Sequence, residues 1–204
     1  MMQAAKERTA SLEIEPLILE AAGRLLSNEG PEALSVRRIA TEAGVAPMGV
    51  YNHFESKSGI IDALFRNGFD RLRLALDSLQ GIADPSEALF EAGRHYRSLA
   101  LAAPQLYQLM FFRVVPGFVP TPASGLVALE SFSSLVQIMD RAIATKVLPP
   151  LEPTTAAQIF WSAIHGWVSL EISGPSFAND PDTGADLLIR SVIEGLKVSE
   201  SRQE

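Results

Sequence analysis

Apolar residues recur every three or four positions along almost the whole chain, which is the pattern of helices with one buried face. The first such segment spans about residues 12–28, with Pro16 expected in its first turn, where proline is tolerated. Two short segments follow, because Ser35 is a good N-cap, Gly44 can end one helix and Pro47 can open the next. Two short helices around a glycine-containing turn predict a helix-turn-helix, whose second helix enters the major groove of DNA.

The rest of the chain predicts longer helices. Ser56 can cap a fourth helix that connects the first segments to the remainder, and Asp84-Pro85-Ser86-Glu87 has the residues of a capping box. Helical spacing then continues over about residues 85–103, 104–111, 123–147, 154–173 and 182–198. Residues 115–122 are rich in proline and are expected to form a loop.

No segment shows the sustained alternation of a strand, so we predict an all-α protein of about nine helices. A small N-terminal head is expected over residues 1–55, a connector helix over 56–82 and a larger helical bundle over 83–204.

Composition narrows the class of protein. The chain has 204 residues, of which 47% are hydrophobic, which is ample for a buried core. It has no cysteine, which excludes disulfides and cysteine-ligated zinc and fits a reducing cytoplasm. No apolar stretch reaches about 18 residues and no secretory signal is visible, so we expect a cytoplasmic protein without a membrane span. The histidines, His53, His95 and His165, are too scattered to predict a metal site, and no cofactor is expected.

The charge distribution matters more than its sum. A formal net charge of −7 argues against general affinity for nucleic acid. Arg37, Arg38 and Lys57 nevertheless cluster in the helix-turn-helix stretch, so any DNA contact is expected in the N-terminal third.

This stretch, with its Ala-Gly-Val turn and the Tyr-x-His-Phe-x-x-Lys that begins at Tyr51, resembles the DNA-binding signature of the TetR family of bacterial transcriptional regulators. The likeness covers roughly residues 12–65. In the penultimate helix, Trp161, His165-Gly166-Trp167 and Glu171 resemble a C-terminal domain class of that family with a Trp-His-Gly theme.

The resemblance implies a regulator that is no enzyme. It implies a homodimer, formed through the last two helices, that binds a roughly palindromic double-stranded DNA operator. It also implies a repressor, in which a small-molecule effector in the C-terminal bundle moves the connector helix and weakens DNA binding. The head would then be the DNA-binding domain and the bundle the ligand-binding and dimerisation domain.

The family signature also assigns roles in DNA contact. Tyr51, His53 and Lys57 match positions that hold phosphates, and Arg37 matches one that can reach base edges. The full candidate set is Arg37, Arg38, Thr41, Pro47, Met48, Gly49, Tyr51, Asn52, His53 and Lys57. The recognition helix begins with Ala46-Pro47-Met48-Gly49, which offers almost no side-chain hydrogen bonds, so base reading would depend on Arg37, Asn52 and methyl contacts to thymine. The alternative is that the polar side chains are only solvated and that Tyr51 mainly packs.

Aromatic and methionine residues in the middle helices predict a mainly apolar effector cavity. The candidates are Phe90, Tyr96, Tyr107, Met110, Phe111, Phe132, Met139, Trp161 and His165. Each could equally be core, and for His165 a hydrogen-bonded core position and a pocket position are both open. Arg94, Arg97 or Arg113 could hold an acidic ligand group or be a solvated surface charge.

The residues also allow two alternatives to a DNA-binding regulator. Ser162 and His165 lie one turn apart, which would suit a nucleophile and its base, but the chain has no Gly-x-Ser-x-Gly elbow and no evident oxyanion hole. A helical small-molecule-binding protein without a DNA function is the second alternative. The helix-turn-helix signature argues against both.

Overall fold

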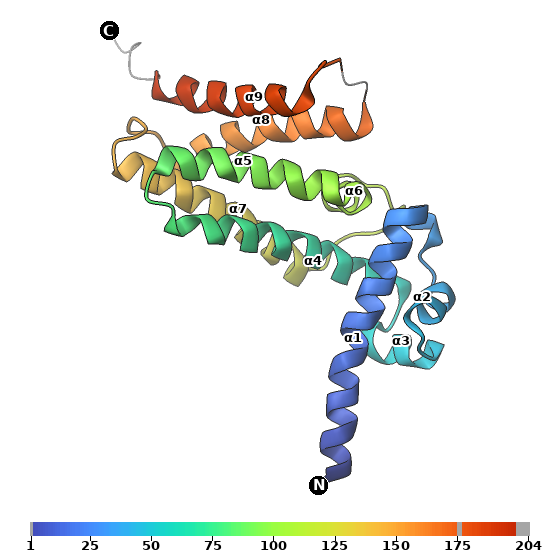
Figure 1. The fold of residues 1–204 in the computed structure, drawn as a ribbon. Coiled ribbons are helices and arrows are strands. Elements are labelled where there is room, and N and C mark those ends of the chain that lie inside the picture. Colours follow the sequence, from blue (N-terminus) through green and yellow to red (C-terminus); the bar gives the residue numbers. More distant parts are fainter. Residues whose placement is uncertain (1, 175–176, 199–204) are drawn as a thin grey trace. The chain divides into compact units, whose positions relative to one another are not determined.

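The computed structural model describes residues 2–174 and 177–198, with side chains from residue 14 onward, and all regular structure in these ranges is helical (Figure 1). The all-α prediction is therefore confirmed. The helices are α1 (Met2–Glu29), α2 (Val36–Ala43), α3 (Pro47–Phe54), α4 (Lys57–Asp77), α5 (Pro85–Ala102), α6 (Pro104–Phe111), α7 (Pro122–Ala144), α8 (Pro153–Ser173) and α9 (Pro181–Lys197), with short 3-10 helices at Pro31–Ala33 and Ser78–Gly81. None of the helices in these ranges is long and apolar enough to cross a membrane.

The short helices of the head begin and end at the residues that the sequence indicated. The Ser35 hydroxyl accepts a hydrogen bond from the Arg38 N–H at 3.3 Å, which caps α2. Gly44 ends α2 in the left-handed conformation, with φ 69°. Pro47 is the first residue of α3, and the Ser56 hydroxyl accepts from the Gly59 N–H at the start of α4. Local chemistry therefore fixes these boundaries.

Two expected boundaries are wrong. α1 begins at Met2, so Pro16, which is exposed, lies inside the helix rather than in its first turn. α7 ends at Ala144, because Lys146 adopts a φ of 60° and the Val147 N–H bonds back to the Ala142 carbonyl at 2.9 Å. This is a Schellman-type ending, and the apolar Val147 just beyond it continues the hydrophobic pattern past the end of the helix.

The chain forms two compact units that alternate along the sequence, one of residues 1–68 and 103–126, the other of 69–102 and 127–204. In the first unit α1, α2, α3 and the start of α4 share one hydrophobic core with Leu109 of α6. Phe118, in the segment between α6 and α7, packs against the same core. The helix-turn-helix head is therefore completed by residues that lie about fifty positions further along the chain.

In the second unit α5 packs against both α8 and α9, and these two helices pack against each other. Gly93 of α5 allows the close approach, because a Cβ atom there would lie 2.8 Å from Ile189 Cδ1 and 3.0 Å from Ile164 Cδ1. Both isoleucines are buried, so this unit has its own core of helix-to-helix contacts.

Candidate functional site

The recognition helix α3 has two distinct faces. Val50 and Phe54 are buried in the core of the head, which fixes the rotation of the helix about its axis. Met48 is 66% exposed and Tyr51 is 49% exposed, and Asn52 is also exposed. The apolar start of this helix is therefore presented to solvent, as a surface that enters a DNA groove must be.

The remaining candidates on the head divide into free and paired side chains. Arg37 and Lys57 are exposed and have no ion pair among the residues that the structure describes, and Lys57 lies in the first turn of α4, whose N-terminus favours anions. The Arg38 guanidinium instead contacts the Glu29 carboxylate at 2.5 Å. The Thr41 hydroxyl donates to the Arg37 carbonyl at 3.0 Å, and His53 is half-buried beside Phe54.

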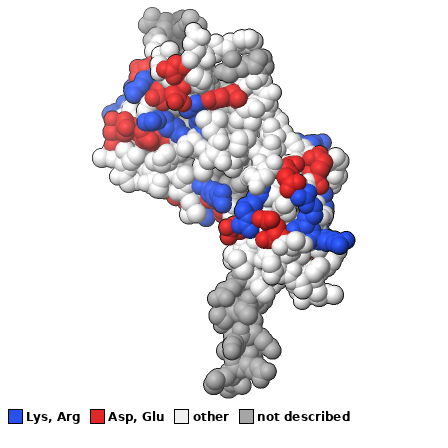
Figure 2. Space-filling model, turned by 45° about the vertical axis from the view of Figure 1, so that its right-hand side comes forward, with Lys and Arg blue, Asp and Glu red and all other residues white. Residues whose placement is uncertain are grey.

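A shallow pocket of about 240 Å³ brings Arg37 and Thr41 next to Leu25 of α1 and Glu42 of α2. The Arg24 guanidinium donates to Glu42 and to Glu20, each at 2.8 Å. These acidic residues are not among the site residues that the sequence predicts. The spacing of Glu20 and Arg24 on one helix indicates their pair, but the link to Glu42 joins different helices. On the face drawn in Figure 2, basic and acidic side chains are accordingly interspersed.

Four of the nine candidate cavity residues form an aromatic cluster in the second unit. Phe132 and Trp161 have their ring centroids 6.0 Å apart, and Trp161 lies 5.1 Å from His165. The Tyr96 hydroxyl lies 2.7 Å from His165 Nδ1. Burial lowers the pKa of His165, so the neutral imidazole is favoured and Nδ1 can accept this hydrogen bond.

The other five candidates have their own surroundings within each unit. Met139 of α7 is fully buried, and the ring of Phe90 lies 4.1 Å from the guanidinium of Arg190. Tyr107, Met110 and Phe111 belong to the first unit, where Tyr107 and Phe111 have ring centroids 5.1 Å apart. The structure thus joins Tyr96, Phe132, Trp161 and His165 directly.

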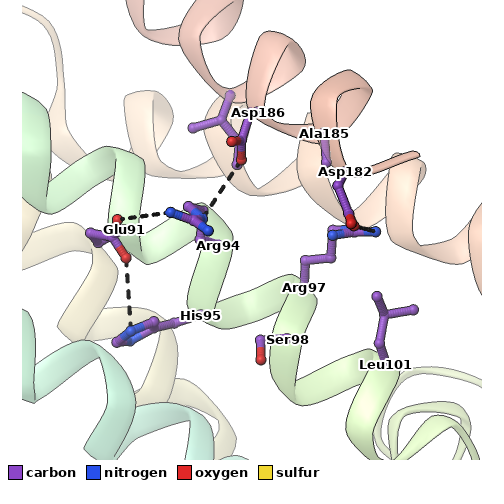
Figure 3. A pocket seen from close by; sticks show the side chains of 10 residues that line it. Glu91, Arg94, His95, Arg97, Ser98, Leu101, Asp182, Ala185 and Asp186 are labelled. Carbon is purple, nitrogen blue, oxygen red and sulfur yellow. Dashed lines mark ion pairs between the residues drawn. The ribbon is translucent and has the colours of Figure 1, made fainter. Parts of the chain in front are cut away.

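A charged pocket of about 520 Å³ lies between α5 and α9 in the second unit (Figure 3). Arg97 reaches Glu171 Oε1 and Oε2 at 2.6 and 2.8 Å and Asp182 at 2.7 Å, and the hydrogen bond to Glu171 is the largest cause of its raised pKa. Within the described ranges, the ion pairs of Arg94 are longer, at 3.6 Å to Glu91 and 3.7 Å to Asp186. Arg97 is therefore part of an internal network, whereas Arg94 is a loosely paired surface charge and Arg113 is exposed.

Ser162 and His165 are each hydrogen-bonded to another side chain. The Ser162 hydroxyl accepts from the Gln158 amide at 3.0 Å, and His165 Nδ1 is bonded to the Tyr96 hydroxyl. Neither contact joins the serine to the histidine as a nucleophile to its base.

The head has a helix-turn-helix with an exposed recognition helix, and its Arg37 and Lys57 form no ion pair within the part of the chain that the structure describes. Joined by α4 to a second helical unit, this head defines a helical DNA-binding regulator. Residues 18–64 match the family described as "Bacterial regulatory proteins, tetR family", and residues 89–192 match "Tetracyclin repressor-like, C-terminal domain". The chain belongs to the TetR family of bacterial transcriptional regulators.

Relatives support the same assignment. The HTH-type transcriptional regulator Rv1816 of Mycobacterium tuberculosis is 24% identical over 90% of this chain and 88% of its own. The HTH-type transcriptional repressor KstR2 of the same species is 34% identical over 40% of this chain and 44% of its own. A solved structure of a protein with unknown function from Rhodococcus sp. RHA1 has 25% identity, covers 90% of this chain and 95% of its own, and gives a TM-score of 0.80.

Proposed function

We propose that this DNA-binding regulator is a cytoplasmic, homodimeric repressor that a small-molecule effector releases from a palindromic operator. The observation that carries the proposal is the arrangement of the head, where α3 exposes Met48 and Tyr51 while Arg37 and Lys57 stay free of ion pairs among the described residues. The name of the relative KstR2 supports repression rather than activation.

The candidate side chains suit different parts of a duplex. Lys57, Tyr51 and His53 can each give a charge or a hydrogen bond to a phosphate oxygen. Arg37 offers a fork suited to the edge of guanine, and Met48 can contact the methyl group of thymine. Since Pro47 and Gly49 have no polar side-chain atoms, much of the remaining sequence preference would come from DNA shape.

Dimerisation would use the last two helices. Ile159 and Leu170 of α8 and Leu187 of α9 are large apolar side chains that are at least half exposed in the single chain. A second copy would cover such residues and place two heads about 34–36 Å apart, which is one turn of DNA.

The effector would bind at the aromatic cluster of Tyr96, Phe132, Trp161 and His165, which suits a largely apolar ligand with one polar group. It would change the separation of the heads through α4. A coupling free energy of about 1–3 kcal/mol between the two sites is typical, and the effector must bind the two conformers with different affinity.

The head can be tested with the DNA upstream of the protein's own gene, by gel shift and anisotropy against unrelated duplexes. Lys57→Ala should weaken binding similarly for all sequences, whereas Arg37→Ala should also reduce the preference for the specific duplex. Loss of the same factor on every duplex in both variants would exclude base reading by Arg37. A wild-type protein that forms no salt-sensitive, sequence-preferring complex would exclude the proposed operator.

A further inference from the structure

The three basic side chains of the helix-turn-helix stretch are not equivalent in the structure. Arg37 and Lys57 have no ion pair among the described residues, whereas the Arg38 guanidinium lies 2.5 Å from the Glu29 carboxylate. The hydrogen bond to Glu29 is also the largest cause of the raised pKa of Arg38. One of the three is therefore already engaged by an anion of the protein itself.

This pair joins two helices at a defined place. Glu29 is the last residue of α1, and Arg38 lies in the first turn of α2, where its N–H is bonded to the Ser35 hydroxyl at 3.3 Å. A second pair, Arg24 with Glu42 at 2.8 Å, joins α1 to the last turn of α2. Both ends of α2 are thus tied to α1 by charge.

The same arrangement disfavours a phosphate at Arg38. A phosphate at Arg38 would lie beside the Glu29 carboxylate, which already accepts a hydrogen bond from Arg38 Nη2, and like charges repel at such distances. Glu42 lies in the same shallow pocket as Arg37 and Arg38, which adds a second carboxylate nearby. Lys57 has no such competitor among the described residues.

We propose that Arg38 is a positioning residue that acts through Glu29. It holds α2 against α1, so that Arg37 and α3 meet the DNA in a fixed orientation, and it makes no phosphate contact itself. This assignment rests on the proposed DNA-binding face and divides its basic residues into contacts, Arg37 and Lys57, and a support, Arg38.

The first test is the salt dependence of binding to a nonspecific duplex, which needs no operator. Anisotropy titrations between about 50 and 200 mM salt give the slope of log K against log salt, and each lost phosphate contact lowers the magnitude of that slope by about 0.9. We expect Arg38→Gln to keep the wild-type slope, with a small loss of affinity at every salt concentration. Lys57→Gln, the matched control, should lower the slope by about 0.9 for each head that binds.

A fall in slope for Arg38→Gln equal to that for Lys57→Gln would overturn the proposal. An unchanged slope for Lys57→Gln would instead contradict the proposed DNA-binding face. The two failures are therefore distinguishable in one experiment.

The second test exchanges the charges of the pair. Arg38→Glu alone should weaken DNA binding strongly, because two carboxylates would then face each other beside the DNA. The double variant Glu29→Arg/Arg38→Glu re-forms the pair in reverse and should recover most of the wild-type affinity and the wild-type slope. Circular dichroism melting identifies variants that are folded. A folded double variant that binds no better than Arg38→Glu would show that an arginine is needed at position 38 for contact and would overturn the proposal.

Discussion

Two arginine–glutamate ion pairs, one in each unit, differ in their exposure to water and therefore in what they contribute to the protein. Arg38 and Glu29 are nine residues apart, and their side chains are 48% and 47% exposed. Arg97 and Glu171 are 74 residues apart, are only 15% and 13% exposed, and form two hydrogen bonds. Exposed pairs are screened by water and salt and contribute little to stability, whereas loss of one partner of a buried pair leaves an uncompensated charge. The first pair can therefore orient a helix, and the second stabilises the fold.

The largest expected effect is therefore at Arg97. Arg97→Ala should lower the free energy of unfolding by about 3 kcal/mol, because Glu171 would stay largely buried without its partner. Arg94→Ala on the same helix is the matched control and should cost about 0.5 kcal/mol or less, since Arg94 is exposed and loosely paired. Urea unfolding followed by circular dichroism measures both. Equal losses in the two variants would mean that burial does not distinguish these arginines.

The first unit contains a half-buried carboxylate, Asp62, whose contribution to stability can be compared with that of an exposed one. Asp62 of α4 accepts hydrogen bonds from the Thr121 N–H at 2.9 Å, the Thr121 hydroxyl at 3.0 Å and the buried Ser124 hydroxyl at 2.7 Å. Asp62→Ala should cost about 1–3 kcal/mol of unfolding free energy, because these donors lose a charged acceptor. Asp140→Ala, at an exposed acid of α7, is the control in the same urea titration. A loss no larger than that of the control would show that the Asp62 cluster does not stabilise the unit.

The N-cap of α8, Glu152, should make the stability of the second unit depend on pH. Glu152 caps α8 by accepting from the N–H groups of Thr154 and Thr155, and hydrogen bonds to Thr155 and then Thr154 lower its pKa from 4.5 to about 2. A lowered pKa in the folded state means that the stabilisation is complete above pH 4.5 and is lost as the pH falls toward 2. Glu152→Gln should therefore have a lower melting temperature than the wild type at pH 7. Thermal melts at several pH values should show that this gap in melting temperature closes below pH 4. A gap that stays constant between pH 7 and pH 3 would contradict the role of the carboxylate.

The smallest expected effect on stability is at Arg38. Both partners of the Arg38–Glu29 pair are about half exposed. Arg38→Gln should therefore change the melting temperature less than Arg97→Ala, Asp62→Ala or Glu152→Gln does. Thermal melts of the same protein samples that are used in the DNA titrations measure this change in melting temperature. A loss of stability as large as that of Arg97→Ala would remove the difference between the two pairs.

Local chemistry made the helix boundaries of the head predictable. Ser35, Gly44 and Pro47 act within one helical turn, so their preferences hold wherever the segment lies in the fold. Pro16 shows the limit of this reasoning, since it was expected in the first turn and lies inside α1. A proline restricts a helix but does not by itself mark where the helix begins.

The candidate cavity shows what residue type alone cannot predict. The nine aromatic, methionine and histidine candidates share a composition, but the structure joins four of them in the second unit and places Tyr107, Met110 and Phe111 in the first. The candidates of α6 belong to the first unit because α6 contributes to the hydrophobic core of the head. Periodicity indicates which face of a helix is buried but not which other helix covers it.

The sequence by itself determined the all-α class, the helix-turn-helix and the basic residues that could meet DNA, because helix periodicity, caps and turn residues act over a few positions. Only the tertiary structure decided which of those residues form ion pairs. Arg38 meets Glu29 across a turn, and Arg97 meets Glu171 across 74 positions, because folding brings distant charges within hydrogen-bonding distance. The role of each arginine depends on its ion-pair partner and on its exposure to water, and the local sequence predicts neither of them.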